Sequence, residues 1–533
     1  MSDNIEALEV LENDEATSKA SRESRSRREK DLQLLESIAG GLELFKGTDD
    51  TEYALLPNDG GRATAVYSRN LKNWLGSETY GRDENPVQPV TMDEFLDRLA
   101  ARARFGGDER SVHVRVALKD TEVWLDLGGN EPSFVHVTPT GWSVLSNSPI
   151  AFKKSPQTRE LPRPVHGGSV DELRPFVNAG SDEDFMLMVG WAIGVLVDDG
   201  PVPILALQGQ QGSAKSTTAK VLARLLDDSA SPLRAYPHDT DSLFIAATSR
   251  RVLAFDNLSR LSGERADDLC RIATGIATGK RRLYTDGEEH VIQTRNPVIL
   301  NGIDTLAERP DLVSRTIVIE LPAIPDIDRL PEREFWDRFE AARPRVLGAA
   351  LDVVAAVLKN WDTTYAPNGA RMADFVAHVT AAEDYLGWLE GSFADAYTSN
   401  QENSNQVALD SDPLSQALLD YMGSRTTGTV VEHTATQWCE KLEPHWPDRK
   451  KAFPGNAQML SNRLKRLAPA LRDIGVKVEW AKLTDRIRTR VIRVSCDEPA
   501  PVRELGKDMS AYEAMARLDL RKPPKGPAER TAQ

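Results

Sequence analysis

The chain has 533 residues, of which 40% are hydrophobic and 28% charged, and its formal net charge is −15. This length exceeds what one compact core supports, so we expect a multidomain protein of roughly three or four units. With an acidic start and no apolar run of membrane-spanning length, we expect a cytoplasmic protein without a membrane partner. Three widely separated cysteines, Cys270, Cys439 and Cys496, indicate neither a disulfide framework nor a zinc site.

The first part of the chain predicts a tail and a mixed domain. Residues 1–30 are charged and lack apolar periodicity, which is typical of a disordered tail. Residues 31–155 contain short alternating segments at 112–118, 122–127 and 134–137, separated by Gly, Asn and Pro, together with a helical stretch from Met92 to Arg104. We interpret residues 31–155 as an α+β accessory or interaction domain.

Residues 170–330 contain a strand, a glycine-containing loop and a helix in succession. Helical patterns at 172–178 and 182–197 lead into a short apolar run, 203–208, and a second helical pattern covers 216–226. The loop between them matches the phosphate-loop pattern, except that Ala214 stands where a glycine normally precedes Lys215. The alternative is a simple Gly/Ser turn before a helix.

This motif has a defined chemistry. Backbone N–H groups wrap phosphates at a helix N-terminus, Lys215 reaches the β and γ oxygens, and Ser216 binds Mg²⁺. We therefore expect ATP and Mg²⁺ as cofactors, and we expect Ala214 to need a right-handed helical conformation. The expected nucleotide-binding residues are Gly209, Gln210, Gln211, Gly212, Ser213, Ala214, Lys215, Ser216 and Thr217.

Two further apolar strands end in polar residues. The strand 251–257 ends in Asp256, which is expected to help Ser216 hold Mg²⁺. Asn257 follows where a glutamate often polarises the attacking water, so the identity of the base stays open. The strand 296–302 ends in Asn301, whose amide can position the water, although a strand-ending Asn-Gly turn explains it equally.

Arg315 comes just before another apolar strand. An arginine there could reach the ATP of a neighbouring subunit and stabilise charge on the transferred phosphoryl group. An ordinary surface ion pair is the alternative. The candidate catalytic residues are Lys215, Asp256, Asn257, Asn301 and Arg315.

Beyond the core, residues 331–400 predict a helical region and 398–412 a polar linker. Residues 410–496 show three helical patterns and then two strands, the order of a winged helix, and 497–533 predict a disordered tail. From Lys441 to Arg493 there are 14 Lys and Arg against 5 Asp and Glu, so we expect DNA contact here rather than only a solvated basic face. The candidate DNA-binding residues are Arg463, Lys465 and Arg466 on the third helix and Arg486, Arg488 and Arg490 on the ribbon.

The motifs from Glu172 to Glu320 resemble the superfamily 3 helicases within the AAA+ ATPases, in particular helicase-primase ATPases of phages, plasmids and prophages in actinobacteria. The resemblance implies an AAA+-like parallel sheet, with Asn301 as the first sensor and Arg315 as a finger acting in the next subunit. It would allow a primase in residues 31–155, but we find no paired carboxylates and histidine for a two-metal site there.

The family also places a β-hairpin between its second and third motifs, which corresponds to residues 279–292. The DNA-binding candidates here are Lys280, Arg281 and Arg282, at its root. The tip contains Asp286 and Glu289, and acid in a channel would repel phosphate. Either the basic root lines the pore or the ring does not translocate as its relatives do, and a plain solvated turn is the third interpretation.

The resemblance implies an ATP-hydrolysing, ring-forming DNA helicase or replication-initiation ATPase of a phage, plasmid or prophage element. Its partners would be single-stranded or forked DNA, further copies of the chain in a hexamer, and other replication proteins. An alternative is an ATP-gated DNA-binding switch or loader without unwinding activity. A third hypothesis is a DNA-binding regulator with a vestigial ATPase core, which only Ala214 supports.

Overall fold

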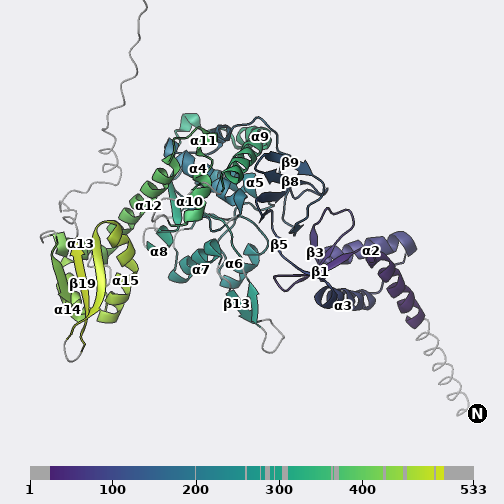
Figure 1. Ribbon diagram of the computed structural model, residues 1–533, viewed down its shortest axis with the longest axis horizontal. Helices are drawn as coiled ribbons and strands as arrows, with labels where there is room; N and C mark the ends of the chain where they lie inside the picture. The colour runs from purple at the N-terminus through teal and green to yellow at the C-terminus, as the bar shows by residue number, and fades with distance from the viewer. Residues whose placement is uncertain are drawn as a thin grey trace, which may run out of the picture. The chain divides into compact units, whose positions relative to one another are not determined.

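The computed structural model describes residues 24–83, 85–198, 200–258, 261–275, 278–281, 289–292, 294–302, 310–361, 364, 371–423, 428–447, 453–484 and 488–496. The chain forms two compact units, Met1–Ala408 and Leu409–Gln533 (Figure 1). In the part of the chain that the structure describes, no helix combines the length and apolarity that crossing a membrane requires.

The first unit begins with a small α+β layer. A four-stranded sheet has the order β3-β2-β1-β4, and its strands are β1 (Glu43–Gly47), β2 (Glu52–Leu55), β3 (Ala63–Ala65) and β4 (Glu109–Arg110). The helices α2 (Arg69–Asp83) and α3 (Pro89–Gly106) pack with it, and α3 buries Phe95 and Leu99 completely. The predicted helix from Met92 to Arg104 is confirmed.

The expected disordered tail is wrong for residues 24–30, which belong to a helix covering 24–39. This helix buries Leu35 and Ile38 in the core with α3, and its Arg28 pairs with Glu94 of α3 at 2.6 Å. The apolar residues that anchor this helix follow Lys30. The charged turns before them therefore show no apolar periodicity from which a helix could be predicted. Residues 1–23 lie outside the described residues.

A second sheet is an antiparallel meander of β6 (Val116–Lys119), β7 (Glu122–Asp126), β8 (Phe134–Thr138) and β9 (Gly141–Leu145). Its inner residues, among them Leu125 and Val135, share one hydrophobic core with the helices α4 (Asp182–Val197) and α9 (Glu332–Lys359). The domain boundary expected near residue 155 is therefore wrong. The meander needs the helices that follow it to bury its apolar face. The strands β5 (Val112–His113) and β10 (Ala151–Phe152), which flank the meander in the sequence, form a short parallel pair.

The central sheet is parallel and has the order β12-β15-β11-β16. Its strands are β11 (Ile204–Gln208), β12 (Leu253–Phe255), β15 (Val298–Asn301) and β16 (Thr316–Glu320). Alternate residues of β11 enter different cores: Leu205 and Leu207 lie with α4 and α5 (Lys215–Leu226), and Ile204 and Ala206 lie with α6 (Thr240–Ala247) and α7 (Gly263–Thr274). Both faces of the sheet are covered, which is typical of parallel sheets with continuous apolar strands.

After α8 (Pro310–Val313), β16 and the short turn η3 (Asp326–Asp328), the chain is helical in α9, α10 (Ala373–Thr380), α11 (Glu383–Leu386) and α12 (Ser392–Ser411). The described part of residues 331–400 is mostly helical, and the polar linker expected at 398–412 is helical up to Ser411. Its polar residues pair with the edge strand: the Asn400 amide bonds both the N–H and the carbonyl of Val318, and Gln401 donates to the Thr316 carbonyl. Side-chain amides thus satisfy the open edge of β16.

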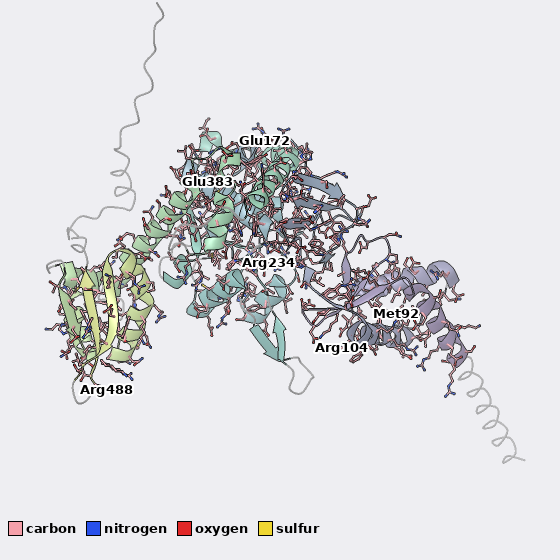
Figure 2. All side chains as sticks on the ribbon, viewed as in Figure 1. Met92, Arg104, Glu172, Arg234, Glu383 and Arg488 are labelled. Carbon is pink, nitrogen blue, oxygen red and sulfur yellow. The ribbon has the colours of Figure 1, made fainter. Side chains whose placement is uncertain are left out.

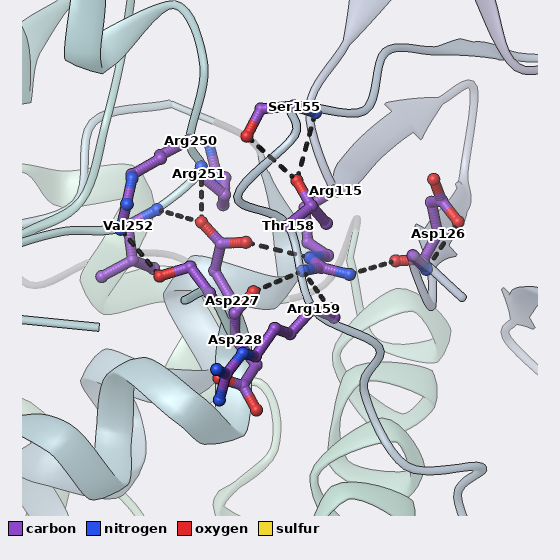
Figure 3. Close-up of polar contacts among 12 residues, drawn as sticks. Arg115, Asp126, Ser155, Thr158, Arg159, Asp227, Asp228, Arg250, Arg251 and Val252 are labelled. Atoms are coloured by element: carbon purple, nitrogen blue, oxygen red, sulfur yellow. Dashed lines mark hydrogen bonds and ion pairs between the residues drawn. The ribbon is translucent and has the colours of Figure 1, made fainter. Parts of the chain in front are cut away.

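A buried ionic network joins the meander to α5 and β12 (Figure 3). Arg115 precedes β6, and its Nε donates to Asp227 Oδ1 at 3.0 Å, with only 2% and 6% of the two side chains exposed. Asp227 follows α5, and its Oδ2 accepts the backbone N–H groups of Arg251 and Val252 at the start of β12. The remaining Arg115 donors reach the carbonyls of Asp126, Arg159 and Asp228. The network therefore fixes the strand that leads to Asp256.

The second unit contains α13 (Pro413–Gly423), β17 (Val430–His433), α14 (Ala435–Leu442), the turn η4 (Glu443–His445), α15 (Ala457–Asp473), β18 (Val476–Lys482) and β19 (Arg490–Cys496). The sheet order is β17-β19-β18, all antiparallel. Trp438, Leu464 and Val494 are fully buried in its core. The three expected helices and the ribbon are present, and β17 is an addition that the sequence reading missed.

Candidate functional site

The loop between β11 and α5 turns tightly at two glycines. Gly209 has φ 137°, and a Cβ there would lie 2.4 Å from the carbonyl oxygen of Leu321. Gly212 has φ 86°, a region that residues with side chains rarely adopt. The strand, loop and helix expected from the sequence are therefore present, with both glycines where the backbone needs them.

Ala214 does not have the expected right-handed conformation. Its φ of 59° and ψ of 27° are left-handed, and α5 begins directly after it, with Thr218 donating to the Ala214 carbonyl. The loop enters the helix by reversing the hand of the backbone at this residue, which is what the usual glycine permits. Alanine keeps the same geometry at a cost of about 1–2 kcal/mol.

Lys215 lies across the loop. Its Nζ donates to the carbonyl oxygen of Gly209 at 2.6 Å and to that of Gln210 at 2.8 Å. The ammonium charge is thus held against the first two loop residues. This is the position from which a lysine can reach a phosphate chain wrapped by the same loop.

The start of α5 and the ends of two strands bring a hydroxyl, a carboxylate and an amide together. Ser216 Oγ donates to Asp256 Oδ1 at 2.8 Å, across α5 and the end of β12. Asn301 closes β15, is 2% exposed, and its Nδ2 lies 3.4 Å from Ser216 Oγ. Its Oδ1 accepts the backbone N–H of Asn257 at 2.7 Å. Sequence reasoning had singled out each of these residues, and the structure places them side by side.

The donor set suits magnesium bound with a nucleotide. Mg²⁺ prefers oxygen ligands and usually binds through one or two protein groups, with phosphate and water completing its shell. Ser216 Oγ and the Asp256 carboxylate are such groups, directly beside the phosphate loop. Among the described residues, no cluster of three or more His, Cys, Asp or Glu side chains is placed to hold a metal ion.

Asn257 has an exposed side chain and a left-handed backbone with φ 54°. Its N–H orients Asn301, which gives it a role through the main chain. A carboxamide does not take up a proton at neutral pH, so its side chain can orient a water but cannot deprotonate it.

Arg315 lies at the amino ends of the parallel strands, whereas the loop follows their carboxyl ends. Its carbonyl accepts the N–H of Ile204, where β11 starts, whereas the phosphate loop follows the end of β11. The length of the five-residue strand β16 puts about 16 Å between the amino ends and the carboxyl ends of the strands. Arg315 is therefore remote from the loop of its own chain.

Asn178 belongs to the site and was missed in the sequence. Its Nδ2 donates to the carbonyl of Ser213 at 3.0 Å and to that of Pro322 at 2.6 Å. It thus fastens the phosphate loop to the chain that leaves β16. In the sequence, Asn178 is only the last residue of a predicted helix. That position does not indicate contacts with residues 35 and 144 positions away.

The expected hairpin is present as β13 (Thr278–Arg281) and β14 (Glu289–Ile292), which pair antiparallel. The register places Lys280 opposite His290 and Arg281 opposite Glu289. Arg282 and Asp286 lie outside the described residues, so the expected roles of the basic root and acidic tip stay predictions.

In the second unit, the DNA-binding candidates differ in their surroundings. Arg463 binds Asp412 at 2.8 Å, and its guanidinium lies 5.8 Å from the Trp446 ring, so it serves the fold rather than an open basic face. Lys465 and Arg466 are exposed on α15. The exposed Arg488, labelled in Figure 2, lies two residues before β19, and the exposed Arg490 is the first residue of β19; Arg486 lies outside the described residues.

Two protein-family models match this chain, one within each unit. Residues 170–402 match the family model of the actinomycete integrative conjugative element replication protein, and residues 414–509 match that protein's C-terminal domain. This chain is a replication protein of a conjugative element. The first match contains the parallel sheet and every loop and strand-end residue described above, and the second coincides with the second unit.

Two solved structures illustrate what this chain is similar to in fold. One is described as the SCCmec type IV Cch active helicase, with 14% identity, a TM-score of 0.45, and coverage of 86% of this chain and 93% of that chain. The other is the A form apo structure of the NrS-1 C terminal region, with 11% identity, a TM-score of 0.39, and coverage of 87% and 98%. Among curated proteins, none matches this chain.

Proposed function

We propose that this replication protein is an ATP-hydrolysing, ring-forming DNA helicase or replication-initiation ATPase of its element. The observation that carries the proposal is the meeting of Lys215, Ser216, Asp256 and Asn301 at the carboxyl edge of a parallel sheet. Ligands of open α/β sheets bind at this edge. The lysine, hydroxyl and carboxylate are the groups that a phosphate loop needs to hold Mg-ATP.

Each residue has a defined task in this proposal. Lys215 binds the β and γ oxygens, and Ser216 and Asp256 hold the magnesium ion that neutralises charge on the phosphates. Asn301 presents its amide toward the reacting water, because the Asn257 N–H fixes its oxygen and leaves Nδ2 as the donor. Bound Mg-ATP supplies the phosphoanhydride bond that water cleaves.

The position of Arg315 supports assembly of several copies. Since this residue lies on the far edge of the sheet from its own loop, it can complete a site only in a neighbouring chain. We therefore propose that hydrolysis needs oligomerisation, as a hexameric ring. DNA would contact Lys280 and Arg281 of the hairpin and the exposed Lys465, Arg466, Arg488 and Arg490 of a winged-helix second unit.

Two defective variants test the shared site. Lys215→Ala should abolish hydrolysis, whereas Lys220→Ala, further along α5, should keep it. Arg315→Ala should bind nucleotide but not hydrolyse it. Mixing the Lys215→Ala and Arg315→Ala proteins should restore part of the ATPase rate, because some interfaces then combine an intact loop with an intact arginine. If the mixture stays inactive although the two variants co-assemble, the role of Arg315 in the neighbouring site is wrong.

A second candidate function is an ATP-gated switch or loader without unwinding activity. Asn257 favours it, because the residue that follows Asp256 in the sequence is an amide rather than a carboxylate that could act as a strong base. A strand-displacement assay on forked DNA separates the two functions. A helicase separates the strands with ATP, while a loader hydrolyses ATP and leaves the fork intact.

A further inference from the structure

The chain that leaves β16 returns along the phosphate loop. Leu321 donates its N–H to Gln208 at 2.9 Å, and Ile324 donates its N–H to Gly212 at 3.3 Å. Asn178 ties the same segment to the loop through the Pro322 and Ser213 carbonyls. Residues 321–329 therefore form one wall of the loop, which we call the exit segment.

The exit segment brings Arg329 against the loop. A Cβ built on Gly212 would lie 2.7 Å from Arg329 Nη2, so the guanidinium lies directly against this glycine of the loop. Arg329 Nη1 pairs with Asp326 Oδ1 at 2.8 Å, and its Nη2 donates to the carbonyl of Ile324. The ion pair is open to solvent, with 52% of the arginine and 90% of the aspartate side chain exposed. Such pairs are weak and readily exchanged.

We propose that Arg329 is a second cation of the nucleotide site, acting within its own chain by binding a phosphate of the nucleotide in place of Asp326. The proposal rests on the proposed function. A guanidinium offers two parallel N–H donors to phosphate, and a polyphosphate carries more charge than the single Asp326 carboxylate. The pairing with Asp326 keeps the guanidinium beside Gly212 until it exchanges partners.

This assignment separates two arginines by location. Arg315 lies at the far edge of the sheet and can serve only another subunit, whereas Arg329 lies on the loop of its own chain. Arg329 should therefore affect nucleotide binding by a single chain, independent of assembly.

The test is a titration of the full chain with a fluorescent ATP analogue and Mg²⁺. Arg329→Ala should weaken binding about fivefold to tenfold, the loss of one partly exposed charge-assisted contact. Asp326→Ala should tighten binding about twofold, because the guanidinium loses its competitor. The double variant should match Arg329→Ala. Arg333→Ala, which removes an exposed arginine on α9, should bind as the unaltered protein does.

If the ion pair only fastens the exit segment, Arg329→Ala and Asp326→Ala weaken binding to the same extent, and the proposal is overturned. Unchanged binding by Arg329→Ala overturns it as well. In both cases, the proposed function still holds if Lys215→Ala abolishes nucleotide binding. An unaltered protein that binds no nucleotide at all instead removes the proposed function.

Discussion

Replacing Arg115 with alanine should destabilise the first unit strongly. The change leaves Asp227 buried without its cation, and three backbone carbonyls lose a donor. Breaking one half of a buried pair costs about 3–5 kcal/mol. A large part of this cost should appear in the parallel-sheet core, because Asp227 also anchors the residues that lead into β12.

Urea unfolding followed by tryptophan fluorescence measures the loss. Arg98→Ala is the matched control, since Arg98 pairs with Glu94 at 2.8 Å but is 47% exposed, and its loss should cost less than about 1 kcal/mol. The transition of the second unit should not move. If Arg115→Ala costs no more than Arg98→Ala, or if limited proteolysis shows residues 170–402 still folded while the meander is cut, the meander does not share one folded core with the parallel sheet.

Three further changes test single features. Ala214→Gly should stabilise the first unit by up to about 1 kcal/mol in urea, because relief of the left-handed strain exceeds the added freedom of the unfolded chain; a loss of stability contradicts the assigned conformation. Asn178→Ala should cost about 1–3 kcal/mol and weaken ATP binding, and unaltered affinity would show that the loop needs no tie to Pro322. Burial, with Glu183 and Glu320 nearby, raises the pKa of Asp184 to about 6 from the usual 3.8. Because the folded state holds this proton more tightly, stability should fall as the pH rises from about 4 to 6. Asp184→Asn should remove that loss, so its gain in thermal midpoint should be larger at pH 7.5 than at pH 4, and an equal gain at both contradicts the shift.

The parts of the site that lie next to their own strands could be predicted from the sequence. Asp256 and Asn301 each end an apolar run, and parallel strands bring such ends to one edge. The glycines, the lysine and the serine of the phosphate loop have the spacing of a known motif, so this loop could also be predicted. The conformation of Ala214 was predicted wrongly, because the hand of one residue depends on how the loop enters α5 rather than on its neighbours in sequence.

Features made by contacts between distant residues could not be predicted. Asn178 and Arg329 reach the loop only after α4, the parallel sheet and the exit segment have folded. The meander showed the alternation of a separate domain, and nothing in that pattern revealed that α4 and α9 cover its inner face. Residues 398–412 looked like a linker because their amides, including Asn400, serve the edge of β16 rather than a hydrophobic core.

The most direct measurement is a calorimetric titration of the full chain with ATP, with and without Mg²⁺. We predict one saturable site per chain, weaker affinity without the metal, and no saturable binding by Lys215→Ala. Absence of saturable binding to the unaltered protein, or equal affinity in Lys215→Ala, would contradict the assignment of residues 209–217 as a Mg-ATP site.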